Sequence, residues 1–125
     1  LTGAASGAVG RFTAPVIASD DALYDAVWEA SGISCEKVWR LNADEELFAA
    51  LKSSVADIKN TNPGSPMGGG TITAGLFIKA FTEEKPWVHI DMAPVGWNAE
   101  STPHCCKGGT GYGVSLLYET VKKLQ

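Results

Sequence analysis

Short apolar segments that look like β-strands alternate with amphipathic helical segments along this chain, and this alternation constrains the fold more than any other feature. The apolar runs at 12–18 and 87–93 have the length and composition of strands, and Pro15 favours an edge position or a bulge for the first. This pattern predicts an α/β fold in which helices flank a sheet. The 125 residues suit one compact unit rather than two domains.

The spacing of apolar residues predicts four helices, at about 20–32, 44–53, 71–85 and 112–124. Ser19, Asp20 and Asp21 offer an N-cap and first-turn acids for the first helix, and Thr71 or Thr73 suits the N-cap of the third. Gly32 and Pro86 are expected to end these two helices. The predicted buried faces are Leu23, Ala26, Val27 and Ala30; Leu47, Ala50 and Leu51; Leu76, Phe77, Ala80 and Phe81; and Val114, Leu117, Tyr118, Val121 and Leu124.

Charge and composition argue against several classes of partner. A net charge of -4 gives no broad basic surface for nucleic acid or anionic lipid. The sequence has no run of about 18 apolar residues, so no membrane span is predicted. The three cysteines, Cys35, Cys105 and Cys106, are odd in number and two are adjacent. This pattern favours reduced thiols and a cytoplasmic location over a secreted disulfide framework.

Two local motifs invite chemical interpretations that the residues do not support. The segment 64–71 has the glycine spacing of a phosphate-binding loop, but Gly70 occupies the position of its lysine. A loop that flanks a substrate is the better interpretation. His104, Cys105 and Cys106 are consecutive, and adjacent side chains diverge rather than converge on one metal ion. We predict no catalytic residue and no metal ligand in this chain.

Three longer segments are more specific when they are taken in order. They are Leu1-Thr2-Gly3-Ala4 continuing to Gly10; Ala56-Asp57-Ile58-Lys59-Asn60 followed by the glycine loop and by Thr73 to Phe81; and Trp87-Val88-His89-Ile90-Asp91-Met92-Ala93 followed by Gly109-Thr110-Gly111-Tyr112-Gly113. Their order and spacing resemble the end of the catalytic domain in the leucyl (cytosol) aminopeptidase family, nearest to its "probable aminopeptidase" branch. The resemblance covers essentially all 125 residues.

The resemblance implies a fold, a reaction and an assembly. Residues 1–125 would be the C-terminal part of a di-metal aminopeptidase catalytic domain, the C-terminal portion of a mixed, mostly parallel sheet with flanking helices. The complete protein would release N-terminal amino acids from peptides with two divalent metal ions, zinc or manganese. The family's metal ligands and its catalytic lysine and arginine lie upstream of Leu1, outside this chain. Partners would be the peptide, the remainder of the domain and further copies in a hexamer.

The resemblance also assigns substrate-binding positions. The carbonyl of Leu1 and the amide of Gly3, with Thr2 between them, match backbone groups that bind the substrate peptide. Ala93 and Gly96 match positions that line the pocket for its first side chain. Here Gly96 replaces a bulkier residue, and Pro94 stands in place of a glycine, which suggests a roomier or reshaped pocket. The alternative for Ala93 is ordinary core packing at a strand end, and Asp91 is expected to be a structural hydrogen-bond acceptor.

Two alternatives of other classes stay open on the sequence. One is a non-catalytic paralogue that acts as a structural or assembly subunit. The other is an unrelated small α/β binding module that uses the loop at 64–70 to bind an anion.

Overall fold

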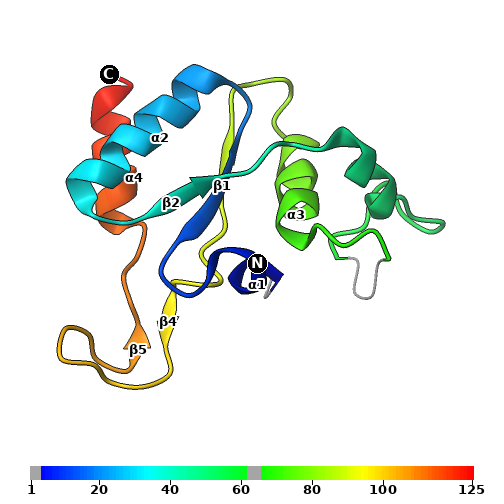
Figure 1. Cartoon of the computed structure of the whole chain (residues 1–125). Helices are drawn as coiled ribbons and strands as arrows, with labels where there is room; N and C mark the ends of the chain where they lie inside the picture. Colours follow the sequence, from blue (N-terminus) through cyan, green and yellow to red (C-terminus); the bar gives the residue numbers. More distant parts are fainter. Residues whose placement is uncertain (1–3, 62–65) are drawn as a thin grey trace.

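The computed structural model describes residues 4–61 and 66–125. These residues form a three-stranded sheet of order β2-β1-β3, with helices on both faces (Figure 1). The central strand β1 (Ala14–Ala18) pairs in parallel with β2 (Val38–Arg40) and antiparallel with β3 (Val88–Ile90). The α/β prediction, a mixed sheet with flanking helices, is therefore confirmed. No helix within the described ranges is long and apolar enough to cross a membrane.

The alternation of side chains along β1 explains why both faces are covered. Val16 points to one face, where it packs with Val27, Ala30 and Leu116 in the main core. Its neighbour Ile17 points to the other face, towards the helix α3 (Gly70–Lys79). Each face of the strand therefore needs its own helical cover.

Pro15 lies in a central strand, so its predicted edge position is wrong. Its carbonyl faces β3 and accepts a hydrogen bond of 2.9 Å from the N–H of Asp91. Regular pairing between β1 and β3 begins one residue later, at Val16 and Ile90. The N–H that proline lacks therefore falls at the end of the ladder, where its loss is tolerated.

On the face of Val16 lie α2 (Asp21–Ser34) and α4 (Val114–Lys123), which pack against each other. Asp20 caps α2 as predicted, because its Oδ1 accepts the N–H of Leu23 at 2.8 Å. The helix continues past the predicted end at Gly32. It stops at Cys35, which adopts the left-handed conformation with φ 59°.

On the other face lie α1 (Ala4–Val9) and α3 (Gly70–Lys79), and the 3₁₀ helix η1 (Glu45–Leu51) packs against α3. The N-cap of α3 is Gly69, with φ 67°, so neither Thr71 nor Thr73 has the predicted capping role. The buried residues of α3 are Thr71, Thr73, Gly75 and Leu76.

The predicted buried face of α3 is therefore partly wrong. Leu76 is buried, but Phe81 is 64% exposed and Ala80 is exposed as well. Close packing explains the difference: a Cβ at Gly75 would lie 3.1 Å from Cδ1 of Ile17. Small residues bring the helix near the sheet, and the phenylalanine beyond its end points away.

The start of α4 is fixed by a carboxylate from the segment between α2 and β2. Glu36 accepts the N–H of Gly113 at 2.7 Å and the N–H of Leu116 at 2.6 Å. These donors have no partner within the helix, and a negative charge is favourable there. The hydroxyl of Tyr112 donates to the carbonyl of Lys37 at 2.5 Å. Burial, reinforced by the charge of Glu36, raises the pKa of Tyr112 to about 12.

We expect Glu36→Ala to lower the free energy of unfolding by about 1–3 kcal/mol, because two charge-assisted hydrogen bonds at a helix start are lost. Urea denaturation of the chain measures this. Glu29→Ala is the matched control, since it removes only the exposed ion pair of Glu29 with Lys123 on the same two helices. Equal losses in the two variants would contradict the capping role.

His89 is a buried histidine on β3, next to Gly75 of α3. Its Nε2 has no hydrogen-bond partner in the described part of the chain. Burial lowers the pKa of His89, and the nearby charge of Asp91 opposes this only in part. The imidazole is therefore neutral in the folded protein at neutral pH.

This lowered pKa predicts a loss of stability in mild acid. Below about pH 6.5 a histidine in the unfolded chain takes up a proton, while folded His89 does not. The stability present above that pH is thus lost as the pH falls towards the lower, folded pKa. Melting temperatures at pH 7.5 and 5.5 should show a drop that His89→Gln reduces. In the control His104→Gln, where the histidine is exposed, the drop should persist.

Candidate functional site

The turn at 92–96, which follows β3, carries the two predicted site residues that the structure describes. Ala93 is exposed and Gly96 is half-buried. The strand β3 ends at Ile90, so Ala93 lies three residues beyond it. The other three predicted residues, Leu1, Thr2 and Gly3, lie outside the described residues.

Asp91 fixes the first half of this turn. Its side chain is fully buried, and Oδ1 accepts the N–H of Ala93 at 3.0 Å. Oδ2 accepts the hydroxyl of Thr71 at 2.8 Å, which ties the turn to the start of α3. Asp91 thus acts as a structural hydrogen-bond acceptor, as the sequence predicted. Carboxylate acceptors form stronger hydrogen bonds than neutral ones, so Ala93 is held firmly.

Thr110 fixes the second half. Its hydroxyl donates to the carbonyl of Val95 at 2.7 Å, and its N–H donates to the carbonyl of Gly96 at 3.1 Å. Thr110 directly follows the hairpin formed by β4 (Trp97–Asn98) and β5 (Gly108–Gly109). The turn is therefore held from α3 on one side and from the hairpin on the other.

Gly96 has a local steric reason to be glycine. The carbonyl of Met92 accepts the N–H of Gly96 at 2.8 Å, which closes the turn tightly. A Cβ at Gly96 would lie only 3.0 Å from that oxygen. A side chain here therefore requires a shift of the backbone, whatever space a pocket offers beyond it.

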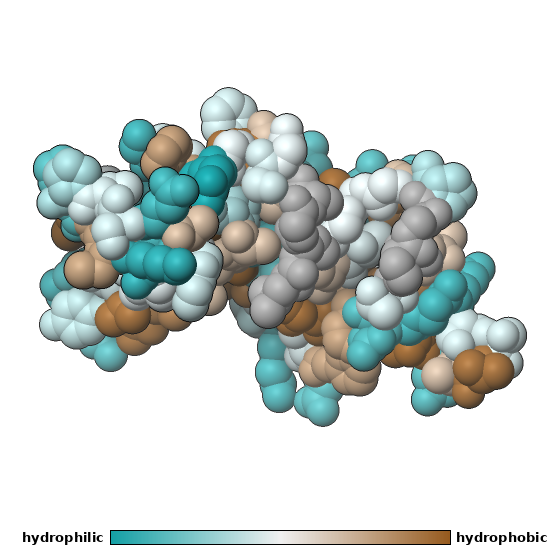
Figure 2. All heavy atoms as spheres, turned by 90° about the horizontal axis from the view of Figure 1, so that it is seen from below, coloured by the Kyte–Doolittle hydropathy of each residue, from teal (hydrophilic) through white to brown (hydrophobic). Residues whose placement is uncertain are grey.

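A groove of about 340 Å³ begins beside this turn. Pro94 and Trp97, the neighbours of the two predicted residues, line it together with Arg11 and Phe12. Phe12 is 82% and Trp97 62% exposed, so the groove presents aromatic surface. On the face shown in Figure 2, hydrophobic surface is divided into patches between hydrophilic residues. The groove suits an apolar group with a polar end.

The sequence interpretation missed Phe12 and Trp97 as groove residues. Phe12 was assigned to the first strand, which begins two residues later, at Ala14. Trp97 lies in β4, a strand that the sequence did not predict. A tryptophan next to a predicted pocket residue was the one available signal.

The chemistry of the described residues does not provide a metal centre. Within 4–61 and 66–125, no three histidine, cysteine, aspartate or glutamate side chains lie together in a way that could hold a metal ion. The thiols of Cys35, Cys105 and Cys106 are free and exposed.

Comparison with known proteins gives a consistent result over nearly the whole chain. The family model described as "Cytosol aminopeptidase family, catalytic domain" matches residues 1–118. The chain is 45% identical over 121 residues to a probable cytosol aminopeptidase of Synechococcus sp. (strain JA-3-3Ab), covering 97% of this chain and 23% of that protein. It is 41% identical over 126 residues to one of Clostridium perfringens (strain 13 / Type A), covering 98% of this chain and 24% of that protein.

Solved structures match the fold. The bottromycin maturation enzyme BotP in complex with Mn superposes with a TM-score of 0.88 at 36% identity, over 99% of this chain and 27% of that chain. A mutant of tomato leucine aminopeptidase superposes with a TM-score of 0.84 at 42% identity, over 98% of this chain and 23% of that chain. The chain thus spans about a quarter of the length of these relatives.

Proposed function

The chain belongs to the cytosol aminopeptidase family, and from this premise we propose that it forms the C-terminal part of a catalytic domain that releases N-terminal amino acids from peptides. The family match over residues 1–118 carries the proposal. The relatives are about four times longer than this chain. We therefore assign the activity to a larger catalytic domain, in which these residues line one side of the substrate pocket.

In this proposal the turn at 92–96 lines the pocket for the first side chain of the peptide. Ala93 and Gly96 contact that side chain, and Leu1, Thr2 and Gly3 hold the peptide backbone. Two features support the role of the turn: hydrogen bonds fix it from both ends, and Ala93 is exposed in this chain. A fixed wall of small residues suits a pocket that must accept side chains of different sizes.

The proposal includes two divalent metal ions, zinc or manganese, held by the rest of the domain. We assign the ligands to residues outside this chain, and the lack of a group of three or more histidine, cysteine, aspartate or glutamate side chains that could hold a metal ion within 4–61 and 66–125 supports this assignment. One structural relative is named as a complex with Mn. The assembly is proposed to be a cytoplasmic hexamer, and peptide is its substrate.

An assay with aminoacyl amides tests the proposed reaction in the complete protein. We expect release of the N-terminal residue, loss of this activity on exhaustive chelation, and recovery when zinc or manganese is returned. A complete protein that is folded and loaded with metal but releases no amino acid would contradict the proposal. That result would instead favour the non-catalytic subunit.

A further inference from the structure

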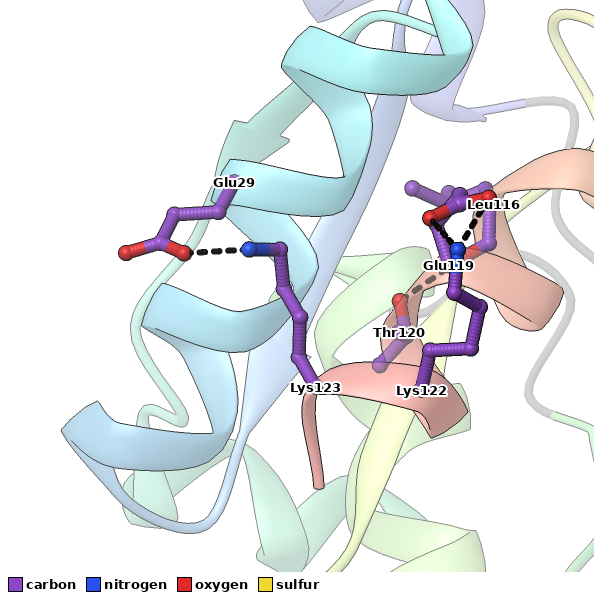
Figure 3. Close-up of polar contacts among 6 residues, drawn as sticks. All are labelled: Glu29, Leu116, Glu119, Thr120, Lys122 and Lys123. Atoms are coloured by element: carbon purple, nitrogen blue, oxygen red, sulfur yellow. Dashed lines mark hydrogen bonds and ion pairs between the residues drawn. The ribbon is translucent and has the colours of Figure 1, made fainter. Parts of the chain in front are cut away.

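The outer face of α4 is an apolar surface that nothing in the described structure covers. The helix packs through Leu116 and Thr120, both buried, and Thr120 satisfies its hydroxyl by donating to the carbonyl of Leu116 at 2.7 Å (Figure 3). The residues predicted to be buried point elsewhere. Their exposed fractions are 72% for Val114, 50% for Leu117, 64% for Tyr118, 54% for Val121 and 55% for Leu124.

We call these five residues the α4 stripe. They follow one another at intervals of three and four residues, which places them on one side of a helix. A stripe of this width is what a helix normally turns towards a protein core. In this chain the predicted periodicity is correct, but the side that meets α2 is a different one.

The charged residues of α4 lie beside the stripe and on the side that faces α2. Lys123 Nζ lies 2.6 Å from a carboxylate oxygen of Glu29 on α2, and Lys122 Nζ lies 3.0 Å from one of Glu119 (Figure 3). The ammonium of Lys122 also lies 5.2 Å from the centre of the Tyr118 ring, so Lys122 borders the stripe. The five apolar residues still share one side of the helix, and contiguous apolar patches of this kind mark interaction sites.

The comparisons show how much of the related fold lies outside this chain. The chain superposes on BotP over 99% of its length, and the match takes up only 27% of BotP. On the proposed assignment of this chain to a larger catalytic domain, the remaining three-quarters of the fold is the surface available to cover the stripe. A second copy of the chain would offer either the stripe itself or another exposed face as the counterpart, and crosslinking distinguishes that outcome.

We propose that the α4 stripe docks against an apolar surface of the remaining three-quarters of the aminopeptidase fold. The proposal rests on the assignment of this chain to a larger catalytic domain, but it does not depend on catalysis. The test therefore measures physical association rather than peptide hydrolysis. The docking proposal and the proposed function can each fail without the other.

The test uses the Synechococcus relative as the probe. The 125-residue chain is co-expressed with that protein lacking its 121 matched residues, and Tyr118 is replaced by the photo-crosslinking residue p-benzoylphenylalanine. We expect irradiation to join the chain to the probe. The same crosslinker at Lys123, which pairs with Glu29 on the side that faces α2, should give roughly tenfold less product or none.

A pair of charge substitutions supplies the matched control. Leu117→Glu puts a charge into the stripe, and Ser115→Glu puts the same charge at an exposed position of the same helix outside the stripe. We expect the first to reduce co-purification of the probe roughly tenfold or more and the second to leave it unchanged. Leu117 is half-exposed in the chain, so circular dichroism of Leu117→Glu alone should match that of the original chain.

Three results would overturn the proposal. One is a crosslink from position 118 to a second copy of the chain. Another is equal co-purification of the two charge variants. The third is an absence of co-purification with the unaltered chain, because a surface shaped for the rest of this fold must recognise it.

Discussion

Replacing Ala93 by leucine in the complete protein is expected to reduce kcat/KM for leucyl and phenylalanyl substrates roughly 10- to 200-fold more than for alanyl substrates. The added isobutyl group fills volume that a large first side chain needs. It leaves the peptide-binding backbone groups assigned to Leu1 and Gly3 unchanged. Because Ala93 is exposed and lies beyond the end of β3, the larger side chain disturbs no core packing in this chain.

The measurement is kcat/KM for alanyl and leucyl amides in the original protein and in Ala93→Leu, with the melting temperature as control. Gly96→Met is a less specific test of the pocket, because a Cβ at Gly96 would lie only 3.0 Å from the carbonyl oxygen of Met92. We expect it to lower both activity and stability. Equal losses on both substrates in Ala93→Leu, with a lowered melting temperature, would show that Ala93 packs in the core of the complete protein.

The 125-residue chain by itself is expected to hydrolyse no aminoacyl amide, whichever of zinc, manganese or cobalt is added. Activating water near neutral pH requires a metal ion held by several fixed ligands. The described residues contain no such group of ligands. The complete protein should hydrolyse the same substrates faster than the isolated chain by the full rate enhancement of an enzyme, which is commonly a factor of about a million or more.

The assay compares the chain with a heat-denatured sample of the same preparation at each metal. Turnover that depends on metal and clearly exceeds the denatured sample would disprove the assignment of all metal ligands to other parts of the domain. A trace of activity that survives denaturation would be a contaminant and would leave the expected result standing.

Two strands, β1 and β3, were predicted from apolar runs that are long enough to be recognised. The strand β2 is only three residues long and was not predicted. Periodicity identifies which residues share one side of a helix but not what lies against that side. The predicted burial of the α4 stripe is therefore wrong within this chain, where Leu116 and Thr120 are the buried residues of the helix.

The helix starts show a second limit. Thr71 has the chemistry of an N-cap, but its hydroxyl donates to Asp91, twenty residues away in sequence. Local rules assign such a hydroxyl to its own helix, because they contain no information on distant acceptors. The capping of α4 by Glu36 is just as distant, and no sequence pattern connects those positions.

The pocket residues came from the family resemblance, and the residues that hold them in place did not. Ala93 and Gly96 match positions of a known pattern, but their attachment depends on Asp91 and Thr110. The lack of space for a side chain at Gly96 is due to the carbonyl oxygen of Met92, and no sequence pattern indicates that contact. The assignments of Leu1, Thr2 and Gly3 stay predictions.

The anchoring of α4 by Glu36 has a consequence for how the stripe meets its partner. Both hydrogen bonds to the helix start, and the bond from Tyr112 to the Lys37 carbonyl, are internal to this chain. The helix is thus already ordered and oriented before association. Binding then loses little backbone entropy, because the stripe docks as a rigid surface and no folding step accompanies it. Glu36→Ala should therefore weaken docking indirectly, through entropy, although Glu36 itself is not part of the stripe.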